Sequence, residues 1–533
     1  MAKAIMIQGT GSGAGKSVVV AGLCRIFRDM GIRVAPFKSQ NMALNSFITK
    51  EGGEIGRAQA FQAEAAGVEP SNDMNPVLLK ASGEAGCQVI LNGRVHRTMK
   101  AAEYYSIKDM VWEVITAAYD RLSSQYDLIV IEGAGSPAEI NLREEEVVNM
   151  RVARYANAPV ILVGDIDRGG VFAQFYGTVE LLKDVTPLYP PLNKGGIKGG
   201  VSDADHIKAF IVNKFRGDMD ILRPGLRMIE EKTDRPVIGT LYHQHNIGLD
   251  EEDGLSIGKA SRFEHSGHRS LRVVVPRLKY ISNFTDFAPF LHEPDVEFKY
   301  TLWEEDIRSA DLIIIPGSKN TVADLLLLRE SGIEGQLKAA AENGTPLIGI
   351  CGGYQMLGRK ILDPHNVESR LKEVDGMGLL DVVTTLDRTK TTCQVEAELI
   401  KSSGFGVKSD SLLKGYEIHM GNTTGDVGLF RLERFNGGQG AGGEVPDGSI
   451  RNNVWGTYIH GIFDNDAVRT ALLNALRRKR GLPEREAACY QSVREEAIDR
   501  WAGTLGRSVD ICFILRQVEM EYCMKKHEAG SEK

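Results

Sequence analysis

A cysteine flanked by glycines is the first candidate for chemistry in this sequence. Residues 347–358 read Leu-Ile-Gly-Ile-Cys-Gly-Gly-Tyr-Gln-Met-Leu-Gly, an apolar run that leads to Cys351 and continues with a helical pattern. Glycines let the backbone crowd around Cys351, so the pattern predicts a strand, a sharp turn and a helix whose N-terminus favours a thiolate. A buried structural cysteine in a glycine-rich turn is the alternative interpretation.

A histidine at the end of a second strand-like run supplies the partner that a cysteine nucleophile needs. Residues 455–461 read Trp-Gly-Thr-Tyr-Ile-His-Gly, which places His460 well after Cys351 in the chain. Nucleophilic attack by a thiol group is helped by a nearby group that takes up and returns a proton. The two residues together predict covalent catalysis by a cysteine.

A glycine-rich loop near the start of the chain is the second candidate site. Residues 9–17 read Gly-Thr-Gly-Ser-Gly-Ala-Gly-Lys-Ser, between an apolar run and a segment with helical periodicity. Such a loop wraps nucleotide phosphates with backbone amides, with Lys16 on the β and γ oxygens and the Ser17 hydroxyl on Mg²⁺. We expect ATP contacts from Thr10, Gly11, Gly13, Gly15, Lys16 and Ser17. A glycine-rich turn that binds no nucleotide is the alternative.

More polar side chains follow strand-like runs in the first half of the chain. The carboxyl ends of strands in a doubly wound sheet face one crevice, so these side chains should gather near the loop. Glu132 ends a buried apolar run, where a carboxylate commonly holds Mg²⁺. We expect contacts to phosphate or to a substrate carboxylate from Lys38, Gln40, Asp165, Asp167 and Arg168. Surface lysines and salt-bridged loops are the alternatives.

Composition bounds the class of protein. The 533 residues carry a net charge of −7, which gives no electrostatic case for binding nucleic acid or an anionic membrane. The seven cysteines show no CxxC spacing, and the sequence has no signal-peptide pattern or long apolar run. We therefore expect a cytoplasmic protein with small-molecule partners, and the sequence leaves its oligomeric state open.

The pattern of elements predicts an α/β fold with two doubly wound domains, the first a parallel P-loop sheet and the second flavodoxin-like. A polar stretch suggests a linker at residues 262–269, between a first domain at 1–261 and a second at 270–480. Residues 481–533 then form an extension with a polar tail. A Pro- and Gly-rich insertion at 184–206 is expected to be a surface loop.

Several segments together resemble the cobyric acid synthases, which join a dethiobiotin-synthetase-like P-loop domain to a class I glutamine amidotransferase domain. The resemblance covers roughly residues 3–500, and its most specific segments are residues 40–45, 164–173 and 456–461. It implies ATP- and glutamine-dependent amidation of the b, d, e and g carboxylates of adenosylcobyrinic acid a,c-diamide. The implied requirements are ATP and Mg²⁺, with the corrinoid as substrate and no tightly bound prosthetic group.

The resemblance also implies roles for residues of both sites. Cys351 would attack the glutamine carboxamide, and His460 would deliver a proton to the departing ammonia. Gly352 and Gly317 would stabilise the oxyanion, and Asn213 stands where the superfamily reads the nucleobase.

One position departs from the amidotransferase pattern. The usual triad has Glu two residues after the histidine, where this chain has Ile462. The orienting carboxylate is therefore missing or elsewhere, and Glu417 is a candidate to replace it. Without such a carboxylate, the resting pair of Cys351 and His460 should be a poor glutaminase on its own.

Two other functions remain open. Cobyrinic acid a,c-diamide synthases share both domains, and only the segments named above argue against them. A nucleotide-switched binding module with an inactive amidotransferase domain would have lost Cys351 or His460, yet both are present. Positioning ATPases of the partition type carry an additional lysine where this chain has Gly11, which argues against that class.

Overall fold

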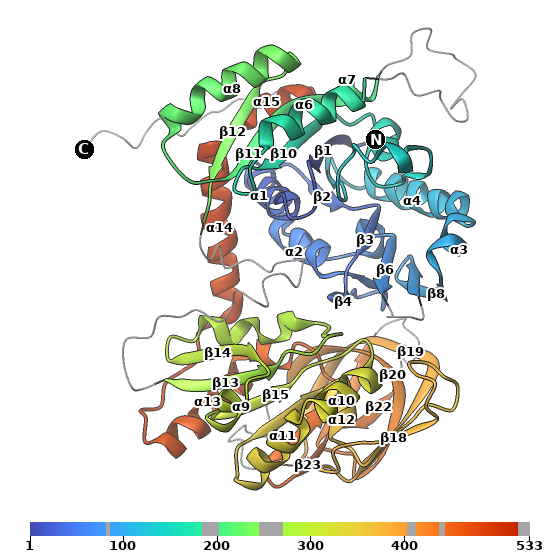
Figure 1. Cartoon of the computed structure of the whole chain (residues 1–533), viewed down its shortest axis with the longest axis vertical. Helices are drawn as coiled ribbons and strands as arrows, with labels where there is room; N and C mark the ends of the chain where they lie inside the picture. The colour runs from blue at the N-terminus through green and yellow to red at the C-terminus, as the bar shows by residue number, and fades with distance from the viewer. Residues whose placement is uncertain (82–85, 184–201, 245–269, 402–411, 436–442, 521–533) are drawn as a thin grey trace.

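The computed structural model describes residues 1–81, 86–183, 202–244, 270–401, 412–435 and 443–520. These residues form two α/β units that follow one another along the long axis of the molecule (Figure 1). The first unit comprises residues 1–244, and the second comprises residues 270–480. The expected linker at 262–269 lies outside the described residues, as does most of the expected insertion at 184–206.

Six parallel strands form the central sheet of the first unit. In spatial order they are β12 (Val237–Tyr242), β11 (Ile207–Phe215), β10 (Val160–Asp165), β1 (Lys3–Gly9), β9 (Leu128–Glu132) and β2 (Val34–Phe37). Both faces of the sheet are covered, which explains why its strands are continuous apolar runs. Along β1, Ala4 and Met6 belong to the core on one face, and Ile5 and Ile7 belong to the core on the other.

Helices cover both faces of this sheet. They are α1 (Lys16–Asp29), α2 (Arg57–Ala66), α3 (Ala101–Tyr105), α4 (Lys108–Ser123), α5 (Met150–Tyr155), α6 (Val171–Leu181), α7 (Asp203–His206) and α8 (Met219–Thr233). Side chains of α1 and α2 contribute to one core, and those of α4, α5 and α6 contribute to the other. The order of the strands reverses on either side of β1, so the crevice for ligands opens at its carboxyl end.

Short strands extend the first unit toward the second (Figure 1). A four-stranded sheet has the order β3 (Gln40–Met42), β6 (Val77–Ala81), β7 (Cys87–Leu91) and β8 (Arg94–Met99), and a hairpin pairs β4 (Ser46–Ile48) with β5 (Glu54–Gly56). The sequence did not reveal that these strands form separate small sheets, because runs of three to six residues carry little periodicity.

A second, mostly parallel sheet organises the second unit. Its strands are β14 (Val296–Thr301), β13 (Leu271–Pro276), β15 (Leu312–Ile315), β16 (Leu347–Ile350), β24 (Val454–Thr457) and the antiparallel edge strand β23 (Ser449–Arg451). Its helices are α9 (Glu304–Arg308), α10 (Thr321–Glu330), α11 (Ile333–Glu342), α12 (Gly352–Leu357) and α13 (Asp466–Arg480). The predicted α/β class is confirmed by the family models and by this pair of sheets.

A third sheet of mainly antiparallel strands adjoins the second. It has the order β18 (Glu373–Asp375), β17 (Lys360–Leu362), β19 (Val382–Leu399), β21 (Phe430–Phe435) and β22 (Glu444–Asp447), with β20 (Leu413–Gly425) paired to β19. β19 is one long strand, with a shift in its register with β20 between Thr385 and Lys390.

The end of the chain returns to the first unit. Helix α14 (Tyr490–Ser508) runs from the second unit to the first, and α15 (Ile511–Gln517) continues there (Figure 1). Ile498 and Leu505 join the core around α1, and the Trp501 indole donates a hydrogen bond to the Val18 carbonyl at 2.6 Å. Among the described residues, no helix has both the length and the apolar character that crossing a bilayer requires.

Candidate active site

Cys351 sits at a strained turn between a buried strand and a helix. It follows β16 and directly precedes α12, with φ +52° and ψ −108°, a conformation that few non-glycine residues adopt. The neighbouring glycines are needed because the backbones are in close contact. A Cβ on Gly353 would lie 2.1 Å from the Ile315 carbonyl oxygen, and one on Gly349 would lie 2.7 Å from Gly353.

His460 is buried three residues after β24 ends, where a carboxylate orients its ring. Nδ1 lies 2.6 Å from Oδ2 of Asp286, and the other oxygen of that carboxylate accepts a hydrogen bond from the Gly461 amide at 3.1 Å. The ring stacks on Tyr416, with centroids 5.3 Å apart. Nε2 is buried and has no hydrogen-bond partner among the described residues. The geometry therefore assigns Nδ1 to Asp286 and leaves Nε2 for chemistry.

The electrostatic environment of His460 favours the imidazolium. Burial alone would lower its pKa, but the Asp286 carboxylate and the nearby Cys351 side chain raise the pKa to about 10. The Cys351 sulfur also lies 3.6 Å from the Ile418 carbonyl oxygen. A buried cation beside a cysteine suits proton delivery to a departing amine.

Glu417 does not orient His460, and that prediction was wrong. Its carboxylate accepts hydrogen bonds from Arg434 at 2.6 Å and lies 3.2 Å from Nε2 of His419. Although burial raises the pKa of Glu417, these two partners hold it at about 2. The side chain is fully engaged within the third sheet, so the orienting carboxylate is Asp286, which the sequence analysis missed.

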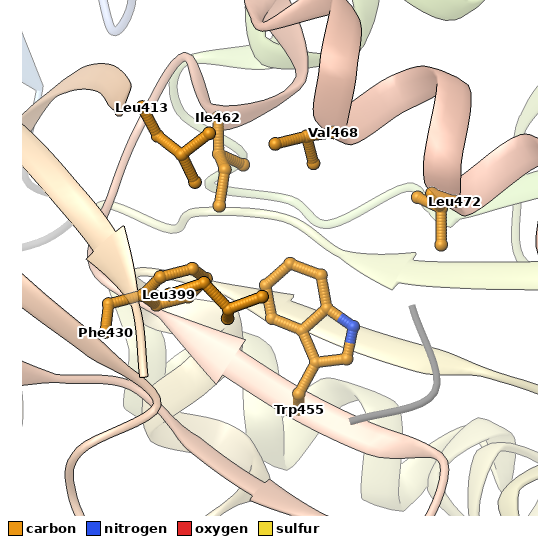
Figure 2. Close-up of a pocket in the computed structure, with 7 residues that line it drawn as sticks. All are labelled: Leu399, Leu413, Phe430, Trp455, Ile462, Val468 and Leu472. Atoms are coloured by element: carbon orange, nitrogen blue, oxygen red, sulfur yellow. The ribbon is translucent and has the colours of Figure 1, made fainter. Parts of the chain in front are cut away.

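The Ile462 side chain packs among apolar side chains, which explains why no carboxylate stands at this position. Figure 2 shows its side chain in a pocket between Trp455, Leu413 and Val468. A carboxylate in that pocket would lose its hydration without gaining a partner. Asp286 instead comes from the 3₁₀ helix η5 (Phe284–His292), which lies 174 residues before His460 in the sequence.

The two predicted oxyanion donors lie on adjacent segments. Gly352 begins α12, so its amide has no acceptor within the helix. A Cβ on Gly352 would lie 2.8 Å from the Ser318 amide nitrogen, and one on Gly317 would lie 3.2 Å from Cε1 of His460. The loop after β15 thus lies against the Cys351 turn and against the His460 ring.

The glycine-rich loop lies at the carboxyl end of β1, and the Asn213 side chain packs against it. Gly13 and Gly15 have φ of +72° and +100°, and a Cβ on Gly15 would lie 2.1 Å from Nδ2 of Asn213. That nitrogen donates a hydrogen bond to the Ala14 carbonyl at 2.8 Å. Asn213 therefore braces the loop here, and its role in reading a nucleobase stays a prediction.

Glu132 is the centre of a buried cluster beside the loop. Its Oε1 accepts hydrogen bonds from the Ser17 hydroxyl at 2.8 Å and from the Lys38 ammonium at 3.0 Å. On the other side, Gln62 and Gln59 of α2 donate to Oε2. These two glutamines could not be predicted from the sequence, because amides on a helix give no distinctive spacing.

The donor set around Glu132 fits a magnesium ion bound together with a nucleotide. Within the described residues, no group of three or more His, Cys, Asp and Glu side chains could hold a metal. Mg²⁺ usually takes one or two carboxylates together with waters and substrate phosphates. Glu132 and the Ser17 hydroxyl are 2.8 Å apart, so both could contact one ion.

The remaining predicted residues of the first unit lie around the same loop. Lys16 donates to the Gly11 and Gly135 carbonyls at 3.1 and 3.3 Å. Asp165 pairs with Lys214 at 2.9 Å, a lysine that also donates to the Gly13 carbonyl at 2.7 Å. The loop is thus tied to the ends of β9, β10 and β11.

Four further predicted residues are engaged near this edge. Arg168 lies 3.5 Å from Asp165, and its guanidinium would be 3.1 Å from a Cβ on Gly13. Asp167 pairs with Arg216 at 3.0 Å, Thr10 donates to Gln174 at 2.7 Å, and Gln40 accepts from the Tyr104 hydroxyl.

Comparison with known proteins covers both units. Residues 5–257 match the model of the CobQ/CobB/MinD/ParA nucleotide binding domain, and residues 272–468 match that of the CobB/CobQ-like glutamine amidotransferase domain. A cobyric acid synthase of Thermodesulfovibrio yellowstonii is 49% identical over 96% of this chain and 98% of its own length. Those of Syntrophobacter fumaroxidans and Thermoanaerobacter sp. (strain X514) are each 45% identical, over 97% and 96% of this chain and 98% of their own lengths. A chain that shares both domains and nearly its whole length with these proteins belongs to the cobyric acid synthase family.

Proposed function

We propose that this protein amidates the b, d, e and g carboxylates of (adenosyl)cobyrinic acid a,c-diamide, with ATP to activate each carboxylate and glutamine as the source of ammonia. The observation that carries the proposal is that one chain holds both halves of such a reaction. A cysteine, a histidine and an aspartate meet in the second unit, and a glycine-rich loop meets a buried carboxylate in the first. Relatives similar over almost the whole chain carry the name of this activity.

The second unit releases ammonia from glutamine. The Cys351 thiolate attacks the carboxamide carbon, and the amides of Gly352 and Gly317 stabilise the oxyanion. His460 donates the proton on Nε2 to the leaving ammonia as the carbon–nitrogen bond breaks. It then takes a proton from the water that cleaves the thioester, which yields glutamate. Asp286 holds the proton on Nδ1 throughout, so Nε2 always faces the substrate.

The first unit makes the carboxylate reactive. An oxygen of the substrate carboxylate attacks the γ-phosphorus of ATP, ADP departs, and ammonia then displaces phosphate from the acyl phosphate. Lys16 and the amides of residues 11–15 bind the phosphates, and Asn213 and Lys214 keep the loop in shape. Mg²⁺ bound at Ser17 and Glu132 would neutralise phosphate charge when present.

Mass spectrometry of the corrinoid product tests the proposal. Cobyrinic acid a,c-diamide incubated with the enzyme, MgATP and glutamine should gain four amides, one at a time. Cys351→Ala should lose synthesis from glutamine and keep synthesis from a high concentration of ammonium, because activation of the carboxylate takes place in the other unit. Lys16→Ala should lose synthesis from both nitrogen sources.

Two outcomes would contradict this assignment. Amidation only of cobyrinic acid itself, at its a and c carboxylates, would identify the sister activity. Equal loss of both nitrogen sources in Cys351→Ala would show that the two units do not divide the reaction in this way.

A further inference from the structure

A short segment of the first unit holds the residues that surround His460. The Ser46 amide donates a hydrogen bond to Oδ1 of Asn283 at 3.0 Å, and the Phe284 amide donates to Oδ1 of Asn45 at 3.1 Å. Asn45, Ser46 and Asn283 are all at most 2% exposed. The two units are therefore joined by a reciprocal pair of buried hydrogen bonds, whose partners have no water to replace them.

The turn that receives these bonds is the one that orients the imidazole. Asn283 has a left-handed φ of +52° and precedes η5, and the Asp286 amide donates to its carbonyl at 3.0 Å. Nδ2 of Asn283 lies 3.3 Å from Nδ1 of His460, beside the Asp286 contact. A displacement of this turn would move Asn283 and Asp286, which both contact Nδ1 of His460.

Ser46 also binds Tyr416, the residue whose ring stacks on His460. Its carbonyl accepts a hydrogen bond from the Tyr416 hydroxyl at 3.2 Å, and the Tyr416 ring stacks on His460. Its hydroxyl donates to Glu54 at 2.7 Å and accepts from Lys80 at 2.6 Å. Every polar group of Ser46 is thus engaged, and its two backbone groups reach the two neighbours of the His460 ring.

The same segment is connected to the ATP side through α2. The Arg57 amide, at the first residue of α2, donates to the Asn45 carbonyl at 3.2 Å. Gln59 and Gln62 follow on the same helix, and both contact the Glu132 carboxylate. One rigid helix of ten residues therefore joins the carboxylate of the ATP site to the segment that supports His460.

We propose that Asn45 and Ser46 are positioning residues for His460, so that the glutaminase site is completed by the first unit and responds through α2 to occupancy of the ATP site. The proposal rests on the proposed function for the identity of the ligands. It assigns Asn45 no contact with any substrate. Asn45 acts only by fixing the position of the turn that carries Asp286.

The test measures glutamate release and ammonium-supported synthesis in the same variants. Asn45→Ala removes the acceptor for the Phe284 amide. We expect its kcat for glutamine hydrolysis to fall at least about tenfold with KM for glutamine unchanged, since a small misplacement of a catalytic group is costly. Addition of MgATP and corrinoid should stimulate hydrolysis in the wild type and not in Asn45→Ala. Asn45→Asp, which keeps an acceptor oxygen at that position, should recover hydrolysis.

Lys50→Ala is the matched control, because Lys50 follows β4 closely and forms an exposed ion pair with Glu69. Synthesis from ammonium should persist in Asn45→Ala, which separates positioning of His460 from a damaged fold. Wild-type hydrolysis by Asn45→Ala, equal loss of both activities, or the same stimulation as in the wild type would each overturn the proposal. Failure of the wild type to amidate any corrinoid would refute the proposed function instead, and the hydrolysis measurements would still decide the role of Asn45.

Discussion

At the scale of single residues, the contact between His460 and Asp286 determines the protonation of the base. The carboxylate lies 2.6 Å from Nδ1, and both side chains are buried, so the imidazolium is stabilised by a charge that water does not screen. This pair also changes the expectation for the resting enzyme. The orienting carboxylate is present, so poor glutaminase activity at rest no longer follows from a missing acid.

Asp286→Asn should shift the pH dependence of glutamine hydrolysis. The pKa of His460 is raised to about 10 largely by Asp286, so the imidazolium persists well above neutral pH in the wild type. Without the negative charge the pKa should fall, and the alkaline limb of the profile should move toward neutral pH. We also expect kcat to fall by about two to four orders of magnitude, since an amide favours the wrong tautomer.

The measurement is kcat for glutamate release as a function of pH. Asp306→Asn is a suitable control, because that carboxylate pairs with Lys299 away from the site. An unchanged alkaline limb in Asp286→Asn would show that the group titrating there is not His460.

The sequence predicted the reactive residues of the site better than the residues that support them. Cys351 and His460 lie in segments whose glycines and apolar runs are distinctive by themselves. Asp286 acts from 174 residues away, on a 3₁₀ turn without periodicity, so no spacing in the sequence connects it to His460. Glu417, the candidate from the sequence, instead pairs with Arg434 and His419.

At the scale of secondary structure elements, the strands β5, β6 and β19 meet in a buried group of charges between the units. Glu54 of β5 pairs with Lys80 of β6 at 2.7 Å and with Lys390 of β19, and all three are at most 6% exposed. Burial lowers the pKa of Lys390, as do the other lysines nearby, and it stands at about 7 despite the attraction of Glu54. One carboxylate is therefore shared by two buried lysines.

Glu54→Gln should destabilise the protein by about 3–5 kcal/mol, because it leaves buried lysines without their counter-charge. The free energy of unfolding from denaturant titration measures this loss. Glu69→Gln removes a carboxylate from an exposed pair with Lys50 and should change stability by less than about 1 kcal/mol. Similar stabilities of the two variants would contradict the view that the buried group holds the units together.

This cluster also explains which strands the sequence could predict. The central parallel strands are apolar because both of their faces are covered, and such runs are easy to recognise. The middle of β19 is polar, and its register shifts between Thr385 and Lys390, where the strand delivers a lysine to the first unit. From the sequence alone, a polar interruption of this kind predicts a turn. The contact that makes it part of a strand comes from the other unit.

At the scale of the whole molecule, helix α14 runs from the second unit back to the first. Besides the packing of Trp501, this helix contributes Arg494, which forms an ion pair with Glu64 of α2. The amphipathic character beyond residue 481 is visible in the sequence, but the surface that its apolar face covers is not, because that surface belongs to the opposite end of the chain.

Trp501→Ala should weaken the first unit although it changes a residue near the end of the chain. The loss of the indole from the core around α1 should cost about 3–5 kcal/mol, as for other buried aromatic side chains. Synthesis from ammonium should become more sensitive to heat than in the wild type, because Val18, which receives the indole hydrogen bond, adjoins Ser17 of the loop. Arg500→Ala changes an exposed neighbour on the same helix and serves as the control. Wild-type heat sensitivity of this synthesis in Trp501→Ala would contradict this placement.

The return of α14 to α1 has a consequence for how the molecule is made. A ribosome synthesises α1 long before α14, and domains generally fold as they emerge. The apolar face of α1 that receives Ile498, Trp501 and Leu505 must therefore stay uncovered until α14 has been produced. Nascent chains stalled before residue 490 should bind chaperones that recognise exposed apolar surface, and chains that include α14 should not.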